Sequence, residues 1–180
     1  MVKLENKLKT TVTKIGILGG TFDPAHKGHL EISKQAKKKF NLKTVIWAIT
    51  KKSPFKNRSK LSLENRIKFA KKLINKHDFI KIKFYEDKIL SNKTIDLINY
   101  LKRNKKYEIN FIMGADNLVS FHKWHKWKSI SQKCKILVFD RQGFKAKSLK
   151  SVTFQHLNNK NLTFINFKKV NISSSQLRKI

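Results

Sequence analysis

The sequence predicts an α/β fold, a doubly wound parallel sheet flanked by helices, on three observations. Segments of strand length alternate with segments whose apolar residues recur at helical spacing along the whole chain. The strand-like segments are largely apolar, which is typical of parallel strands covered on both faces. The first of them ends in glycines and is followed by a helical pattern. Ligands of such sheets bind beyond the carboxyl ends of the strands, so the loops there are where chemistry is expected.

The first two strand and helix pairs occupy residues 14–20 with 27–40, and residues 44–49 with 63–74. Both strands are short apolar runs, and both helices carry apolar residues along one face. Ser62 precedes the second helix and is a residue type that caps helix starts. The alternation of element types therefore begins within the first third of the chain.

The later elements are assigned on the same grounds. Residues 79–85 alternate apolar residues with Lys, and residues 94–101 return to helical spacing. The others are expected, in chain order, as a strand at 109–113, an aromatic-rich helical region at 118–130, a strand at 135–139 and a last strand at 162–167. This order favours a single sheet.

The chain of 180 residues suits one domain, which can bury about 70% of its unfolded surface. We expect a basic tail at residues 1–13 and one domain at residues 14–180, because no linker or repeat interrupts the sequence. No apolar run approaches the roughly 20 residues of a membrane span, and no secretory signal is recognisable. The single cysteine, Cys134, excludes an intramolecular disulfide framework. A cytoplasmic location is expected.

The charge is strongly positive, with 42 basic against 11 acidic residues and a net charge of +31. Such a balance points to an anionic partner, yet only five of the cations are Arg, the residue favoured for reading bases and gripping phosphates. Much of the lysine content therefore reads as compositional bias at solvated positions. The positive field would still concentrate polyanionic small molecules near the protein.

The loop at residues 19–29, GGTFDPAHKGH, is the most informative stretch. Its glycines allow close approach of a ligand to the backbone, and Pro24 fixes a turn before the next helix. The start of that helix offers unpaired N–H groups to an anion. His26 and His29 lie three residues apart, on the same side of the first turn, with Gly28 between them. These donors suit a phosphate chain whose charge grows during transfer.

Two alternatives stay open for this histidine pair, a structural cap and a partial metal site. A zinc site needs further ligands, and no cysteine cluster or second histidine pair supplies them. We therefore predict no protein-bound metal. The loop also lacks the spacing of the Walker motif and of the dinucleotide fingerprint.

The loop resembles the first signature of the adenylyltransferases of the nucleotidyltransferase superfamily. The second signature of that family, ISSS followed by Arg, is matched by ISSSQLR at residues 172–178. Four segments between them are similar to the nicotinate-nucleotide adenylyltransferases in particular: SPFK at 53–56, KTIDLI at 93–98, GADNLVSFHKWHKW at 114–127 and FDRQGF at 139–144. The resemblance extends from residue 15 to residue 178.

The resemblance implies a Rossmann-like fold and transfer of AMP from ATP to nicotinate mononucleotide, which yields deamido-NAD and pyrophosphate in NAD biosynthesis. The mononucleotide phosphate would attack the α-phosphorus of ATP in line, without a covalent enzyme intermediate. Mg²⁺ would be bound mainly through the ATP phosphates. One alternative is a sister adenylyltransferase that uses phosphopantetheine or nicotinamide mononucleotide. The other is a lysine-rich RNA-binding protein on the same fold.

The resemblance also assigns the nucleoside triphosphate site. The expected catalytic residues are His26, His29 and Arg178. The expected ATP-binding residues are Gly20, Thr21, Phe22, His26, Gly28, His29, Ile172, Ser173, Ser174, Ser175 and Arg178. In the second signature the serines can cap a helix start, and the guanidinium one turn later can grip phosphate through its fork.

The middle segments would select the second substrate. Trp124 offers a flat face to a pyridine ring, and Thr94 and the backbone of His125 offer hydrogen-bond donors to its carboxylate. The remaining candidates are Asp116 for a ribose hydroxyl, and Arg141 and Lys56 for phosphate. Four of these residues have a structural alternative, which is core packing for Trp124, a helix cap for Asp116 and an ordinary surface position for Arg141 and Lys56.

The chain stops soon after the second signature, whereas members of this family commonly continue with another helical segment. A helix of two turns tends to fray. Three alternatives are open for this end of the chain. The natural protein is short, a partner or homo-oligomer contact covers the short helix, or the tail at residues 1–13 covers it.

Overall fold

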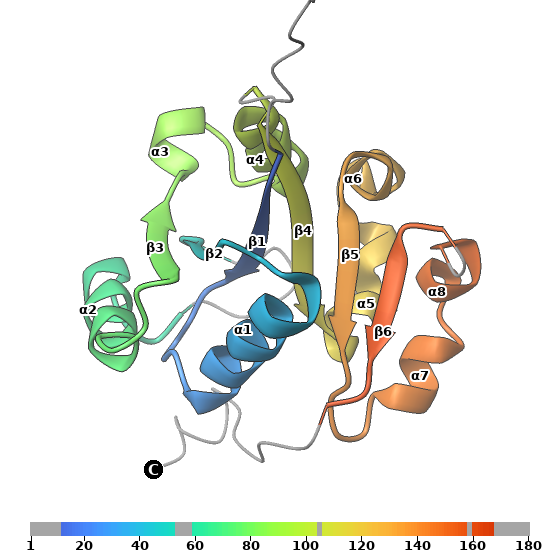
Figure 1. Ribbon diagram of the computed structural model, residues 1–180, viewed down its shortest axis with the longest axis horizontal. Helices are drawn as coiled ribbons and strands as arrows, with labels where there is room; N and C mark the ends of the chain where they lie inside the picture. Colours follow the sequence, from blue (N-terminus) through green and yellow to red (C-terminus); the bar gives the residue numbers. More distant parts are fainter. Residues whose placement is uncertain (1–11, 53–58, 104–105, 158–159, 168–180) are drawn as a thin grey trace, which may run out of the picture.

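The computed structural model describes residues 12–52, 59–103, 106–157 and 160–167. A six-stranded sheet lies at its centre, and every pair of neighbouring strands runs parallel in the order β3-β2-β1-β4-β5-β6 (Figure 1). The strands are β1 (Thr13–Gly20), β2 (Thr44–Ile49), β3 (Ile80–Phe84), β4 (Tyr107–Gly114), β5 (Lys135–Phe139) and β6 (Leu162–Ile165). The predicted doubly wound parallel sheet is confirmed.

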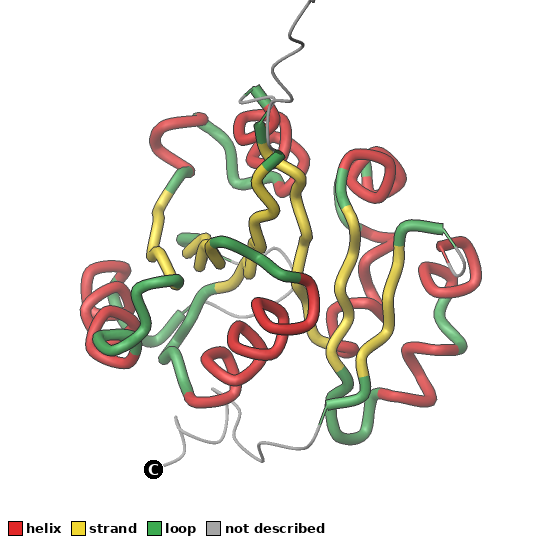
Figure 2. The backbone as a smooth tube through the Cα atoms, viewed as in Figure 1, coloured by secondary structure: helices red, strands yellow, loops and turns green. Residues whose placement is uncertain are grey.

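Helices cover both faces of the sheet (Figures 1 and 2). They are α1 (Lys27–Phe40), α2 (Leu63–Leu73), α3 (Glu86–Ile89), α4 (Thr94–Lys102), α5 (Ala115–Ser120), η1 (Phe121–Lys123), α6 (Trp127–Lys133), α7 (Lys145–Leu149) and α8 (Val152–Leu157). Buried residues of α1 and α2 share one apolar cluster, whereas those of α4, α5, α6 and α8 share the other. The sheet therefore separates two cores, as its apolar strands require.

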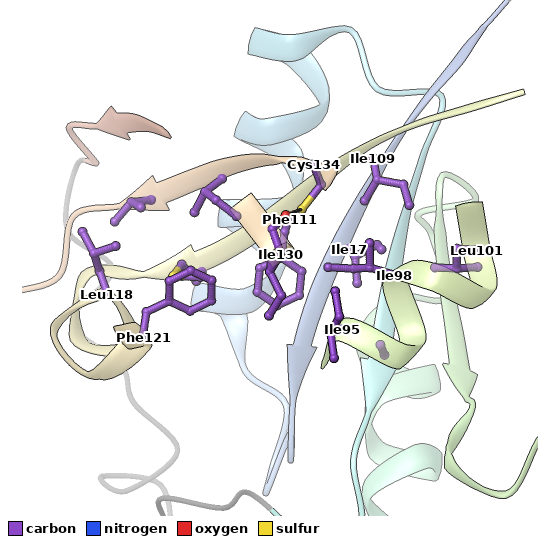
Figure 3. Close-up of a cluster of buried hydrophobic side chains, with 14 of the residues drawn as sticks. Ile17, Ile95, Ile98, Leu101, Ile109, Phe111, Leu118, Phe121, Ile130 and Cys134 are labelled. Atoms are coloured by element: carbon purple, nitrogen blue, oxygen red, sulfur yellow. Dashed lines mark hydrogen bonds between the residues drawn. The ribbon is translucent and has the colours of Figure 1, made fainter. Parts of the chain in front are cut away.

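The larger core lies beneath α4, α5 and α6 (Figure 3). Ile95 and Ile98 of α4 pack there with Ile17 of β1, and Ile98 and Ile17 have no exposed surface. Ile130 of α6 closes the same cluster. On the opposite face a Cβ at Gly16 would lie 2.9 Å from the terminal side-chain carbons of both Ile112 and Leu42, so any larger residue there would displace these two side chains.

Most elements lie where the sequence predicts them, and α1, β2 and β5 keep the predicted bounds. The predicted helical region at 118–130 is wrong as one unit, because the chain forms α5, η1 and α6 with a break between η1 and α6. At that break Trp124 is extended and Lys126 is left-handed, with φ 52°. The short helices α3, α7 and α8 were not predicted, since a helix of one turn shows little periodicity.

The order of the strands reverses between β1 and β4, which are the two inner neighbours of the sheet. The connections that follow such a pair of strands run to opposite faces of the sheet. A crevice therefore opens at the carboxyl ends of the two strands. The loop after Gly20 and the helix after Gly114 leave from this point. No helix in the described part of the chain is long and apolar enough to span a membrane.

Candidate active site

Two histidines build the first turn of α1 by capping each other's backbone. The His26 Nδ1 accepts the Gly28 N–H at 3.1 Å, and the His29 Nδ1 accepts the His26 N–H at 3.2 Å. The two rings lie 3.9 Å apart between centroids. The structural-cap interpretation of this pair is therefore correct, and the rings are fixed relative to the loop that precedes them.

The caps also decide which ring nitrogen carries the proton. A neutral imidazole accepts at one nitrogen and donates at the other. Because Nδ1 of His26 and of His29 accepts a backbone N–H, the proton of each ring lies on Nε2. Both side chains thus serve as Nε2–H donors, and capping leaves the phosphate interpretation intact.

Burial keeps His26 uncharged. Burial is the larger cause and the positive charge of Arg141 the smaller one, and together they lower the pKa of His26 from the usual 6.5 to about 4. At neutral pH this side chain is a neutral hydrogen-bond donor. Such a donor can bind a phosphate oxygen without giving up a proton to it.

A stack of aromatic side chains packs against His29 of the histidine pair. The buried ring of Phe22 lies parallel to Trp47 of β2 at 4.9 Å between centroids and contacts His29 at 4.8 Å. The Trp47 Nε1 donates to the Ser33 Oγ of α1 at 2.8 Å. Phe22 has φ 49°, a left-handed conformation that the packing of its ring holds in place. The Phe22 side chain thus positions His29, and only its backbone remains as a candidate phosphate ligand.

Asp116 and Arg141, two separately predicted substrate contacts, are joined to each other. The Arg141 Nη1 donates to the Asp116 Oδ2 at 2.5 Å, and Asp116 is the more buried partner, with 14% of its side chain exposed. They come from the helix after β4 and the loop after β5. Since Arg141 also acts on the pKa of His26, the carboxyl ends of β1, β4 and β5 converge on one region.

A cavity of about 380 Å³ opens beside this region, at the carboxyl ends of β1 and β2. Five of the predicted residues line it, namely Gly20, Thr21, Thr94, Trp124 and His125. The Trp124 ring stands edge-on to Phe121 at 5.2 Å and to Phe111 at 6.1 Å, so the core sets its orientation. The break before α6 carries Trp124 and His125 to the cavity, and the start of α4 carries Thr94.

Sequence reasoning missed several other residues that line the cavity. They are Thr50, Tyr85, Glu86, Lys93, Asn117 and Lys123. Thr50, Tyr85 and Glu86 directly follow β2 or β3, so their place at strand ends was the available signal. The two lysines were indistinguishable from the others in a lysine-rich chain. Burial raises the pKa of Tyr85, and Tyr100 and Tyr107 act in the same direction.

Other predicted residues lie elsewhere. Gly28 is buried in the first turn of α1, and its N–H is bound to His26 rather than turned to a ligand. Six predicted residues lie outside the described residues, namely Lys56, Ile172, Ser173, Ser174, Ser175 and Arg178. The position of the second signature relative to the histidines is therefore not described either. Within the described ranges no group of three or more His, Cys, Asp or Glu side chains could hold a metal ion.

Comparison with known proteins places the chain in a family. A model of the cytidylyltransferase-like family matches residues 17–180. A protein of Pelagibacter ubique (strain HTCC1062), named "Probable nicotinate-nucleotide adenylyltransferase", is 75% identical over 180 residues, 100% of each chain. The chain belongs to the nicotinate-nucleotide adenylyltransferases. The predicted membership of this enzyme family is confirmed.

More distant members of the family agree. A relative with the same name from Agrobacterium fabrum (strain C58 / ATCC 33970) is 36% identical over 143 residues, 78% of this chain and 76% of the relative. Among solved structures, the nicotinic acid mononucleotide adenylyltransferase of Plasmodium falciparum, complexed with NaAD, superposes with a TM-score of 0.75. That match covers 93% of this chain and 83% of the other at 21% identity, so it confirms the fold.

Proposed function

We propose that this protein transfers AMP from ATP to nicotinate mononucleotide, forming deamido-NAD and pyrophosphate. One observation carries the proposal: Thr94 and Trp124, which belong to different elements, line the same cavity as Thr21 of the loop before α1. A flat ring and hydrogen-bond donors thus line the same cavity as the loop that is proposed to bind phosphate. Membership of the family and the 75% identical relative support the same reaction.

The nicotinate ring is proposed to lie against Trp124. Its carboxylate would meet the start of α4, a helix of nine residues whose first N–H groups at Thr94 and Ile95 face outward from the helix end. The His125 backbone N–H would be the third donor. Lys93 and Lys123 also line this cavity, and their positive charge favours a carboxylate over an amide at the same position.

The proposed ATP phosphates lie beside the histidine pair. His26, which is neutral, and His29 would donate from Nε2. The backbone of Gly20 to Phe22 would line the reacting phosphates, and Arg178 would bind the far end of the triphosphate. The mononucleotide phosphate is already an anionic nucleophile, so the site needs no strong general base. Rate enhancement then comes from holding the two phosphates in line and from donors that meet the charge developing on pyrophosphate.

Mg²⁺ is part of the proposal as a companion of ATP. The described residues around the histidines provide imidazoles, backbone N–H groups and an arginine, a donor set suited to phosphate oxygens rather than to a hard cation. The ion would be bound by the ATP phosphates and water, and there it would neutralise phosphate charge.

The test is a pyrophosphate-release assay with ATP and Mg²⁺ and three separate acceptors. Nicotinate mononucleotide should give the highest kcat/KM, with deamido-NAD as the product detected by chromatography. Higher kcat/KM with nicotinamide mononucleotide or phosphopantetheine would assign the chain to a sister activity. No release with any of the three would reject the enzyme and favour the RNA-binding alternative.

A further inference from the structure

A buried arginine fastens the loop before α1 to the end of β2. Arg66 lies in the first turn of α2, and only 2% of its surface is exposed. Its Nη1 donates to the Thr21 carbonyl at 2.6 Å and to the Thr50 carbonyl at 2.8 Å. Thr21 and Thr50 both line the proposed substrate cavity. One guanidinium thus connects two walls of this cavity.

The Arg66 side chain makes two further hydrogen bonds to main-chain carbonyls. Nε donates to the Leu61 carbonyl at 3.2 Å and Nη2 to the Lys51 carbonyl at 3.3 Å. All four hydrogen bonds that the guanidinium makes within the described residues therefore go to main-chain oxygens. Such bonds fix the direction of peptide planes, whereas a bond to a carboxylate would fix only a side chain.

Two carboxylates bind the same segments of the chain. Asp23, which is buried in the glycine loop, accepts the N–H groups of Lys60 and Leu61 at 2.9 and 3.1 Å. Glu86 accepts the Thr50 hydroxyl and, at 3.2 Å, the Lys51 N–H. Burial lowers the pKa of Arg66 from its ordinary value, and the charges of Asp23 and Glu86 oppose that shift. The guanidinium therefore remains a buried cation beside the loop.

The geometry at Thr21 connects Arg66 to the reaction. In a trans peptide the C=O and the following N–H point in opposite directions. Because the Thr21 carbonyl is turned toward Arg66, the Phe22 N–H is turned away from it. Phe22 belongs to the backbone stretch that the proposed function places against the reacting phosphates. The left-handed φ of Phe22, 49°, means that this peptide is not held by ordinary backbone preference alone.

We propose that Arg66 is a positioning residue for AMP transfer, which aims the Thr21–Phe22 peptide at the reacting phosphates by holding the Thr21 carbonyl. This inference rests on the proposed function. Arg66 itself would contact no substrate. Its loss should therefore impair the step that depends on an aimed donor, while binding of both nucleotides is largely kept.

Steady-state kinetics of Arg66→Ala and Arg66→Lys test the proposal. Losing one preorganised donor typically lowers kcat about 100-fold, and we expect that loss for Arg66→Ala with KM for ATP and mononucleotide changed less than about threefold. Arg66→Lys keeps the charge but lacks the fork, so its kcat should lie between those of Arg66→Ala and the wild type. Added guanidinium ion should restore part of the kcat of Arg66→Ala, because the vacated space and its carbonyls remain.

Two control variants separate positioning from stability. Arg66→Ala leaves buried carbonyls without their donor and should lower Tm. Ile136→Ala, a fully buried position on β5 away from the cavity, should also lower Tm but keep kcat, and guanidinium should not raise its activity. Arg103→Ala removes an arginine that packs over Tyr100 and should change neither quantity much.

The outcomes are distinct. Folded Arg66→Ala with near wild-type kcat, or a rise in both KM values with kcat kept, would overturn the positioning role. If Arg66→Ala does not fold, Arg66→Lys decides, and wild-type kcat in that variant would reject the proposal. A wild-type enzyme that releases no pyrophosphate with any acceptor would instead reject the proposed function itself.

Discussion

The backbone N–H of His26 donates to the Nδ1 of His29 at 3.2 Å, so the second histidine caps the first. This bond fixes the tautomer of His29 and brings the two rings to 3.9 Å between centroids. A side chain that looks like a phosphate ligand is thus also part of the helix start. The proposed phosphate contact would use Nε2 and the cap uses Nδ1, so the two would not compete.

Replacing His29 by Ala should lower kcat by about 100-fold, because one preorganised donor is lost. The cap on His26 is lost as well, which should cost about 1 kcal/mol of folding free energy. Turnover and the urea midpoint of unfolding measure the two effects separately. His77→Ala, which removes a histidine that follows α2, is the control and should keep kcat. Near-normal turnover of folded His29→Ala would contradict the assignment.

The low pKa of His26 predicts how stability depends on pH. The folded state lowers this pKa from 6.5 to about 4, so between these values the unfolded chain binds more protons. Stability from this group is fully present above pH 6.5 and falls as the pH drops toward 4. His26→Asn keeps a residue type that caps helices but does not titrate. Its Tm should therefore fall less than that of the wild type over this range, and equal slopes would exclude His26 as the cause.

Removing the charge of Arg141 should raise the pKa of His26, because Arg141 is the second cause of its depression after burial. The expected value for Arg141→Met stays below 6.5, since burial is unchanged. Titration of the His26 ring by NMR measures it directly. Lys145→Met, which removes a cation that binds Asn166, is the matched control. An unchanged His26 pKa in Arg141→Met would mean that the two groups do not interact.

Trp124→Ala should raise KM for the mononucleotide by about fivefold and KM for ATP by much less, since stacking on one ring is worth about 1 kcal/mol. Trp124→Phe keeps an aromatic face and should recover most of that affinity. Equal rises in both KM values would assign Trp124 to packing against Phe111 and Phe121 alone.

Gly114→Ala tests the pair of Asp116 and Arg141. A Cβ at residue 114 would lie 2.5 Å from the Asp116 Oδ1, so the carboxylate must move and its bond to Arg141 should weaken. We expect a higher KM for at least one nucleotide with a small change in Tm. A double-mutant cycle with Asp116→Ala provides the check. If Gly114→Ala adds its full effect on top of Asp116→Ala, the substitution acts by another route.

The sequence by itself determined the order of the elements, the parallel sheet and the loop that carries the histidines. Apolar period, glycines after a strand and a serine cap are local signals, and they specify local structure without knowledge of distant partners. The enzyme family was also readable, because GGTFDPAHKGH and ISSSQLR are contiguous stretches. The candidate ATP-binding residues came from these two stretches, and the candidate residues for the second substrate came from the segments between them.

Only the tertiary structure decided what those residues contact. Arg66 appeared in the sequence as one residue of a helix start, and its four carbonyl partners are up to 45 positions away. The break that turns Trp124 toward the cavity has no strong breaker, since Lys126 takes the left-handed conformation without being glycine. The pairing of Asp116 with Arg141 likewise joins two strand ends 25 residues apart. Contacts of this kind depend on the order of the strands in the sheet, which local propensity does not encode.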